Sequence, residues 1–303
     1  MRAPRACHYR AAALWPGRKS HPLECSAMKF AICNEQFEGW PFDRVCRFVN
    51  SVGYEGLEVA PFTLAQWITD VTPQQRADLR LQADDAGVEI LGLHWLLAKT
   101  EGLYLTSPDA AVRRRTAAYL VSLAEACHGM GGTIMVFGSP KQRSLLPGVT
   151  TAQAYEWAAE TFRAALPGIA DCGVTLCMEP LSPAETDFVN TCADAVRLCD
   201  MVNHQNFALH LDVKAMSSEP TPVPELIRQY GSRAGHFHAN DSNLRGPGFG
   251  TVDFVPIFHA LREVSYTRWV SVEVFDYSPD PETIARQSID YMLKCLAAPL
   301  AGQ

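Results

Sequence analysis

The sequence predicts a single α/β domain with the (β/α)8 barrel fold, in which eight parallel strands each precede a helix. Short apolar segments alternate with amphipathic segments eight times between residues 28 and 298. Most of the apolar segments are continuous, as expected for parallel strands that are buried on both faces. No linker or low-complexity segment separates the repeats, so we expect one domain over residues 28–298.

Local composition predicts where each element lies. The expected strands cover residues 28–33, 56–61, 88–96, 131–138, 174–180, 207–213, 234–239 and 269–275. The expected helices cover residues 42–51, 109–129, 151–171, 192–202, 223–230, 254–264 and 282–296, and one more begins at Pro73. Thr72, Thr191 and Asp253 are expected N-caps, and Gly53 is an expected helix stop. Pro167 is expected to kink or shorten its helix.

An open doubly wound sheet is the alternative arrangement of these elements. The GxGxxG motif that binds a dinucleotide after the first strand of such a sheet does not follow residues 28–33. We therefore favour the closed barrel.

Residues 1–27 differ in composition from the repeats. They carry five basic residues and one acidic residue, namely Arg2, Arg5, Arg10, Arg18, Lys19 and Glu24. Their apolar residues do not form the continuous core of a secretory signal. We expect an extension that reflects the choice of start site or that is disordered, and a cleaved targeting peptide is the alternative.

Composition excludes several classes of protein. The chain has 303 residues, of which 48% are hydrophobic, but no apolar run is long enough to span a membrane. Its formal net charge of −7 argues against a large nucleic-acid interface, which needs a basic face. The ten cysteines form no CxxC pair and several lie in apolar runs. We expect a soluble, cytoplasmic protein without disulfides.

Polar side chains stand at the ends of four consecutive expected strands. They are Glu179, Asp212, His238 and Glu273. Because the carboxyl ends of barrel strands meet at one mouth, we expect these side chains to converge there. His236 and Asn240 share the face of His238 through strand alternation.

Three carboxylates that converge in an apolar setting repel one another, and a divalent cation would offset that repulsion. Oxygen-rich ligands with one imidazole suit Mn²⁺, Mg²⁺ or Co²⁺ better than a structural zinc ion. We expect Glu179, Asp212, His238 and Glu273 to bind one divalent metal ion, with Mn²⁺ preferred and Mg²⁺, Co²⁺ or Zn²⁺ as alternatives. No other cofactor is expected.

The chain resembles the xylose isomerase-like barrels of sugar isomerases and epimerases, including the D-tagatose 3-epimerase group. The resemblance covers residues 28–298. It rests on MEP (178–180), HLDVKAM (210–216), HFHAND followed by LRGPGFG (236–250) and SVEVF (271–275). Intervals of 33, 26 and 35 residues separate Glu179, Asp212, His238 and Glu273, and they look like those of the ketose 3-epimerases.

The resemblance implies a metal-dependent isomerase or epimerase that moves a proton next to a carbonyl through an enediolate. Glu179 and Glu273 would then be the catalytic proton-transfer groups. A metal ion bound to the carbonyl oxygen would stabilise the enediolate charge. The resemblance also implies a small sugar or polyol-derived substrate, and a dimer or tetramer of identical chains.

Five further residues are candidate contacts to the substrate. Glu185 and Arg245 match family residues that contact substrate, and their alternatives are a solvated loop charge and a loop salt bridge. His94 and Trp95 end the third expected strand, where related barrels line the pocket. Strand alternation places Lys214 on the side of Asp212.

Three other features leave alternatives open. Glu58, inside the second expected strand, could be a buried structural carboxylate. Lys141 and Arg143 lie in the loop 139–149, which could meet a phosphate or be an ordinary solvated loop. Ala215 stands where the 3-epimerases have a histidine that contacts substrate, so the substrate could differ from a free ketose.

Three other functions compete with a sugar isomerase. An endonuclease IV-like phosphodiesterase shares the barrel but uses more histidines, including an Asp-x-His motif that this chain lacks after His238. An eliminase, either an inosose dehydratase or a 3-keto-glycoside lyase, would use the same metal and base to expel a leaving group. A catalytically silent sugar-binding barrel would not need four intact ligands.

Overall fold

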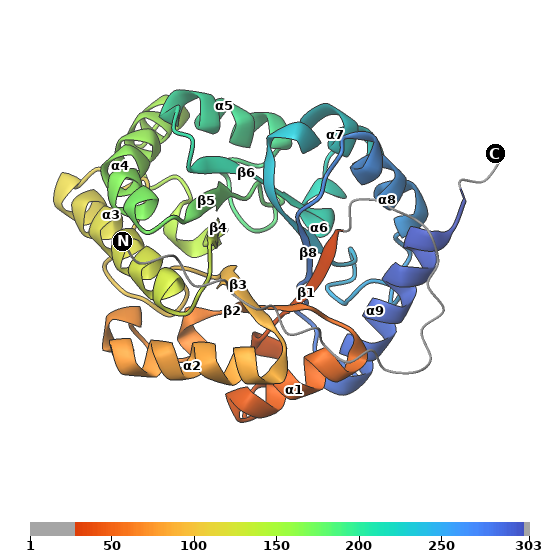
Figure 1. Ribbon diagram of the computed structural model, residues 1–303. Helices are drawn as coiled ribbons and strands as arrows, with labels where there is room; N and C mark the ends of the chain where they lie inside the picture. Colours follow the sequence, from red (N-terminus) through yellow and green to blue (C-terminus); the bar gives the residue numbers. More distant parts are fainter. Residues whose placement is uncertain (1–27, 300–303) are drawn as a thin grey trace, which may run out of the picture.

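The closed ring of strands brings the carboxyl end of every strand to the same mouth. The structure, a computed structural model, describes residues 28–299. Each strand pairs in parallel with its sequence neighbours, and β1 pairs with β8 to close the barrel. Figure 1 shows the helices as an outer ring around the strands. The expected (β/α)8 fold is confirmed, and the open sheet is excluded.

The elements follow the expected order along the chain. The strands are β1 (Lys29–Cys33), β2 (Gly56–Val59), β3 (Glu89–Leu93), β4 (Ile134–Phe137), β5 (Thr175–Met178), β6 (Phe207–Asp212), β7 (Ala234–Ala239) and β8 (Trp269–Val272). The helices are α1 (Phe42–Val52), α2 (Pro73–Ala86), α3 (Ala110–Gly129), α4 (Thr151–Asp171), α5 (Cys192–Val202), α6 (Val213–Met216), α7 (Val223–Tyr230), α8 (Phe254–Glu263) and α9 (Pro281–Ala297).

Several strands end earlier than expected. β3 ends at Leu93 rather than at residue 96, because the backbone turns to a left-handed conformation at Trp95, with φ of 54°. β6 ends at Asp212, whose carboxylate accepts the backbone N–H of Ala215 and so caps the short helix α6. His94, Trp95, Glu179 and Glu273 therefore lie just past their strands, whereas Asp212 and His238 lie within β6 and β7.

Helix ends follow the expected signals. Thr72, Thr191 and Asp253 each accept a backbone N–H of the first helical turn, and Gly53 ends α1 with φ of 112°. Of the two effects expected for Pro167, a kink or a shorter helix, the shorter helix is wrong, since α4 continues through Pro167 to Asp171. A capping box at its start and a buried face along its length offset the hydrogen bond that proline removes.

Two expectations concern the ends and the setting of the chain. The N-terminal extension, residues 1–27, lies outside the described residues. Across residues 28–299, no helix combines the length and apolar character that crossing a bilayer requires. Eight cysteines in this part of the chain are free thiols, and seven of them are buried.

The interior of the barrel holds a buried polar cluster. Aromatic contacts fill the layer between strands and helices, such as Phe137 with Phe162 at 5.2 Å between ring centroids. Inside the strands, by contrast, Glu58, His210, His236 and His238 are fully buried. Barrel interiors are normally filled by branched apolar side chains, so this polar cluster points to function.

Arg143 holds the mouth together from inside the loop 139–149. Its guanidinium is fully buried, so the expectation that Arg143 meets a phosphate or is solvated is wrong. It donates to the carbonyl oxygens of Gly138, Glu179 and Val189 at 3.1, 2.6 and 2.8 Å. Burial lowers the pKa of Arg143 to about 10. These contacts tie the end of β5 to the loops on either side.

Gly92 permits the close approach of β3 and β4. Gly92 faces Ile134 in the strand register, and a Cβ atom at this position would collide with the Ile134 carbonyl group. Both strands would have to separate to accept a side chain, because neither colliding atom belongs to a flexible group.

We expect Gly92→Ala to lower the free energy of unfolding by about 2 kcal/mol or more, through overpacking against the β4 backbone. Denaturant unfolding followed by circular dichroism would measure the change. Gly129→Ala is the matched control, because its Cβ would meet only the flexible side chain of Arg76. That control should stay within about 1 kcal/mol of the wild type. Equal stabilities of the two variants would contradict the close approach.

We expect Arg143→Met to lower the free energy of unfolding by about 3 kcal/mol or more, since it strands three carbonyl groups that Arg143 now satisfies. Lys141→Met, an exposed residue of the same loop, is the control and should change the value by less than about 0.5 kcal/mol. A loss no larger than that of the control would show that Arg143 does not hold the loop.

Candidate active site

A cavity at the mouth of the barrel collects most of the residues that the sequence singles out. His94, Trp95, Glu179, Glu185 and Glu273 all line it, together with Val136, Gly138, Ser139, Pro140, Leu181 and Phe275. Glu179 and Glu273 are 6% and 4% exposed, so their carboxylates meet the cavity while remaining largely shielded from water. The two proposed proton-transfer groups therefore share one enclosed space.

A group of ligand-type side chains lies beside this cavity. Glu179, Asp212 and His238, with His210, offer ligand atoms that all lie within 4.8 Å of one another. All four residues are buried. Such a group could hold a metal ion, with two carboxylates and two imidazoles as donors. Glu273 is not part of this group of four.

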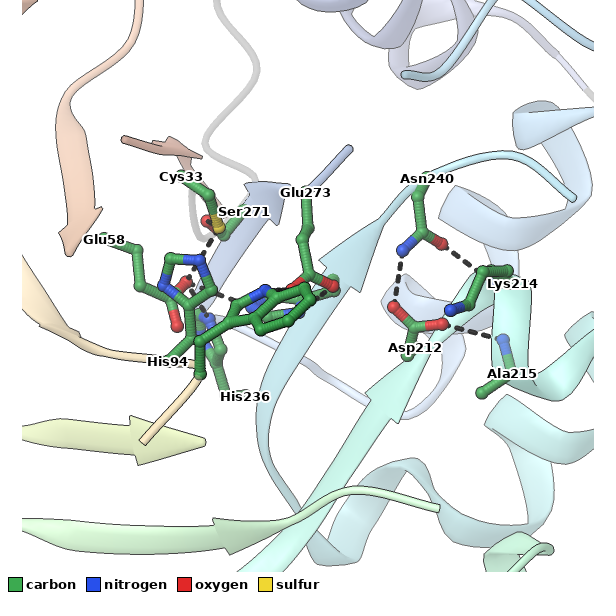
Figure 2. Close-up of polar contacts among 12 residues, drawn as sticks. Cys33, Glu58, His94, Asp212, Lys214, Ala215, His236, Asn240, Ser271 and Glu273 are labelled. Atoms are coloured by element: carbon green, nitrogen blue, oxygen red, sulfur yellow. Dashed lines mark hydrogen bonds and ion pairs between the residues drawn. The ribbon is translucent and has the colours of Figure 1, made fainter. Parts of the chain in front are cut away.

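Glu273 instead connects the group to the other side of the barrel. One carboxylate oxygen accepts the indole N–H of Trp95 at 3.0 Å, and the other lies 3.1 Å from Nδ1 of His238. Figure 2 shows Glu273 between Asp212 with Asn240 on one side and Cys33, Glu58 and His94 on the other. Both oxygens of Glu273 are therefore held in place.

The environments of the two glutamates shift their pKa values in opposite directions. Burial, together with the charges of Glu273 and Asp212, raises the pKa of Glu179 well above its usual value. Burial also opposes ionisation of Glu273, but His238, His94 and Lys214 together outweigh it and lower the pKa of Glu273. Such a split is typical of paired acids and bases in enzymes.

Asp212 is held by two hydrogen bonds from its surroundings. Its carboxylate accepts the side-chain N–H of Asn240 at 2.5 Å and the backbone N–H of Ala215 at 2.7 Å. Burial nevertheless raises the pKa of Asp212, and the charge of Glu273 adds to this while Lys214 opposes it. The site therefore concentrates more negative charge than its hydrogen bonds offset.

Glu58 is a buried structural carboxylate that contacts two of the histidines inside the barrel. It accepts from His236 at 2.9 Å and from His238 at 3.1 Å. Burial alone would raise the pKa of Glu58, but the two imidazoles lower it well below its usual value. Glu58 thus fixes the ring of His238 from beneath, as the carboxylate partners of metal-bound histidines do.

Two candidate substrate contacts are engaged with each other. The Lys214 ammonium lies 2.7 Å from the Glu185 carboxylate and 3.9 Å from the centre of the Phe275 ring. The strand alternation expected for Lys214 is wrong, because the residue lies in α6 rather than on β6. The helical turn nevertheless brings its side chain to the rim of the site.

Arg245 lies farther from the cavity. Its Nε donates to the Asp276 carboxylate at 2.8 Å, and the side chains of both residues are more than one-third exposed. The loop salt bridge was the alternative reading of Arg245, and it is the contact that the structure contains. Arg245 does not line the cavity that holds Glu179 and Glu273.

The sequence also carried signals for residues that were not singled out. His210 lies two residues before Asp212 on β6, so strand alternation places both on one face. Cys33 ends β1 and Glu35 follows it, which is the position at which barrels place functional groups. Glu35 lies 2.8 Å from the His94 imidazole.

Relatives of known activity share most of this chain. The D-psicose 3-epimerase of Agrobacterium fabrum is 32% identical over 238 residues, which cover 75% of this chain and 77% of the relative. The D-psicose 3-epimerase of Ruminiclostridium cellulolyticum is 27% identical over 232 residues, or 75% of this chain and 76% of the relative. These relatives are epimerases, so the expected enzyme class, isomerase, is confirmed. They do not favour the eliminase.

The fold and the family agree with the expected resemblance. A crystal structure of D-psicose 3-epimerase with D-tagatose from Clostridium cellulolyticum superposes with a TM-score of 0.79 at 21% identity, covering 89% of this chain and all of that one. Residues 46–295 match the family described as the xylose isomerase-like TIM barrel. The chain is therefore a member of the xylose isomerase-like TIM barrel family.

Proposed function

We propose that this chain is a divalent-metal-dependent epimerase or isomerase of a ketose or a related carbonyl sugar. One observation carries the proposal: Glu179, Asp212 and His238 form a group suited to a cation beside the cavity that Glu179 and Glu273 share. The named activities of the relatives support the same class of chemistry.

The residues present fit a divalent cation. Glu179 and Asp212 would supply oxygen ligands and His238 a nitrogen ligand, with Glu273 or His210 completing the set. The raised pKa values of Glu179 and Asp212 reflect mutual repulsion and burial, which a bound cation would offset. A bound divalent ion would stabilise the negative charge that develops on the carbonyl oxygen of the substrate. Mn²⁺ is our preferred ion, because the set is rich in oxygen.

Glu179 and Glu273 are the groups that we propose move the proton. They extend from β5 and β8, which are not adjacent in the barrel, into one cavity. One carboxylate would remove the proton from the carbon next to the carbonyl, and the other would return a proton to the opposite face. The indole N–H of Trp95 holds the Glu273 carboxylate in place for this transfer. Arg143 holds the backbone of Glu179 in the same way.

The rest of the cavity would bind the sugar. Trp95 and Phe275 provide apolar walls, and Glu185, held by Lys214, provides a hydrogen-bonding edge. Arg245 would reach a substrate oxygen only after leaving Asp276. Ala215 stands where the 3-epimerases have a histidine that contacts substrate, so we propose a substrate range that extends beyond D-psicose.

The free thiols of the chain support a reducing compartment. Eight cysteines between residues 28 and 299 are unpaired. We propose a cytoplasmic setting on this basis.

We expect the Mn²⁺-loaded protein to introduce deuterium at the carbon next to the carbonyl when ketoses, including D-psicose and D-fructose, are incubated with it in D₂O. Glu179→Gln and Glu273→Gln should each slow this exchange at least about 100-fold, because each removes a proton-transfer group. Nuclear magnetic resonance of the sugars would measure the exchange. Exchange in the wild type without loss of water or an aglycone distinguishes an epimerase from an eliminase.

The control for the exchange experiment is Glu55→Gln. Glu55 is exposed and precedes β2, at the opposite end of the barrel from the cavity. This variant should exchange deuterium at the wild-type rate. Wild-type exchange in Glu179→Gln or Glu273→Gln would refute the role assigned to that residue, and release of a leaving group by the wild type would favour the eliminase.

We expect Mn²⁺ to stabilise the protein against heat, by about 2.7 kcal/mol at a concentration one hundred times its dissociation constant. Asp212→Asn should lose most of this cation-dependent gain, because it removes a charged ligand. Differential scanning calorimetry with and without Mn²⁺ would measure the gain separately from the stability of each apo variant.

Asp241→Asn is the matched control for the cation experiment. Asp241 is also fully buried and follows β7, but it is not among the four residues whose ligand atoms converge. This variant should keep the Mn²⁺-dependent gain. An equal gain in the wild type and in Asp212→Asn would mean that the cation binds elsewhere.

A further inference from the structure

A second group of ligand-type side chains lies at the ends of β1 and β3. Ligand atoms of Cys33, Glu35 and His94 lie within 4.8 Å of one another, and all three residues are buried. Cys33 is the last residue of β1, Glu35 opens the turn that follows, and His94 comes directly after β3. None of the three belongs to the group formed by Glu179, Asp212 and His238.

The polar atoms of this second group are only partly satisfied. The Cys33 thiol has two distant contacts, at 3.6 Å from the Ser271 hydroxyl and 3.8 Å from the Glu58 carboxylate. Glu35 and His94 share one hydrogen bond of 2.8 Å. Among the described residues, Oε1 of Glu35 and Nδ1 of His94 are buried without a partner. Buried polar groups normally find partners, so these atoms indicate a missing ligand.

The charges around Cys33 favour a cation. Two carboxylates flank the thiol, Glu35 from the turn after β1 and Glu58 from the neighbouring strand β2. Figure 2 shows Glu58, Cys33 and His94 on the same side of the barrel interior. His236 and His238 already engage Glu58. Among residues 28–299, the Glu35 carboxylate has only the His94 imidazole as a hydrogen-bond partner.

We propose that Cys33, Glu35 and His94 form a second metal site, which takes a zinc-type ion such as Zn²⁺ or Co²⁺. A thiolate, an imidazole and a carboxylate are the donors that these ions prefer, whereas the first group offers no sulfur. Glu58 or a water molecule would fill the fourth position. In tetrahedral coordination, ligand atoms lie about 3.3 Å apart, so Glu35 and His94 need to separate only slightly.

An ion can reach this site from the surface. Glu35 lines a groove on the outer side of the mouth, together with Trp40, Phe62 and Tyr277. His94 lines the cavity that contains Glu179 and Glu273. The site therefore lies between two openings. An ion there would hold the backbone next to Trp95, whose indole N–H contacts Glu273.

Titration of the metal-free full chain with Co²⁺ tests the proposal. The expected result is a sulfur-to-cobalt charge-transfer band in the near-ultraviolet, with one Co²⁺ per chain responsible for it. Cys33→Ala should lose the band and bind one Co²⁺ fewer. Glu35→Gln, which removes a charged ligand, should weaken binding of that ion at least about tenfold.

Cys177→Ala is the matched control, since Cys177 is also a fully buried strand cysteine but lies outside this group. Cys177→Ala should keep the sulfur-to-cobalt band and bind as many Co²⁺ ions per chain as the wild type. A wild-type protein that binds Co²⁺ without the band, or a band that survives in Cys33→Ala, overturns the proposal. The proposal does not depend on the site formed by Glu179, Asp212 and His238. Asp212→Asn should keep the charge-transfer band even if it no longer binds an ion at that site.

Discussion

Negative charge buried at one end of the barrel is the constraint on which the rest of the site depends. Glu179, Asp212 and Glu273 are all nearly inaccessible to water. The charges of Asp212 and Glu273 oppose the ionisation of Glu179, and the charge of Glu273 also opposes that of Asp212. Such a cluster persists only where positive groups or a cation stand beside it. His238 and Lys214 supply part of that compensation from the protein itself.

The supporting groups come from different parts of the chain. Asn240 and the backbone of Ala215 hold Asp212, whereas Glu58 and Glu273 hold the ring of His238. The barrel brings these partners together because parallel strands all end at one mouth. Asp212 and His238 are therefore each held by a neighbour in or directly after another strand, Asn240 and Glu58 respectively.

The order of apolar and amphipathic segments predicts both the barrel fold and the convergence of the site residues at its mouth. Alternating apolar and amphipathic segments specify strand and helix order, and strand order then specifies which residues meet. Glu179, Glu273, His94 and Trp95 were found in this way, since each lies at or just past a strand end. Their shared position did not depend on the detailed path of any loop.

The contacts made by loop residues could not be predicted in the same way. The sequence of the loop 139–149 does not show that three carbonyl groups surround Arg143, because the path of the loop brings them there. Strand alternation fails to place Lys214, because Asp212 caps a helical turn that includes this residue and nothing in the sequence shows that cap. Arg245 likewise pairs with Asp276, which lies 31 residues away in the chain. Such partners depend on conformations that residue order alone does not specify.

The buried guanidinium of Arg143 has a consequence for directed evolution of this protein. Loops at the mouth of a barrel are natural targets for randomisation, because they surround the ligand and tolerate substitution. Here, one position in such a loop belongs to the scaffold and carries the backbone of Glu179. A library over residues 139–149 that keeps arginine at position 143 should contain far more folded members than one that varies every position.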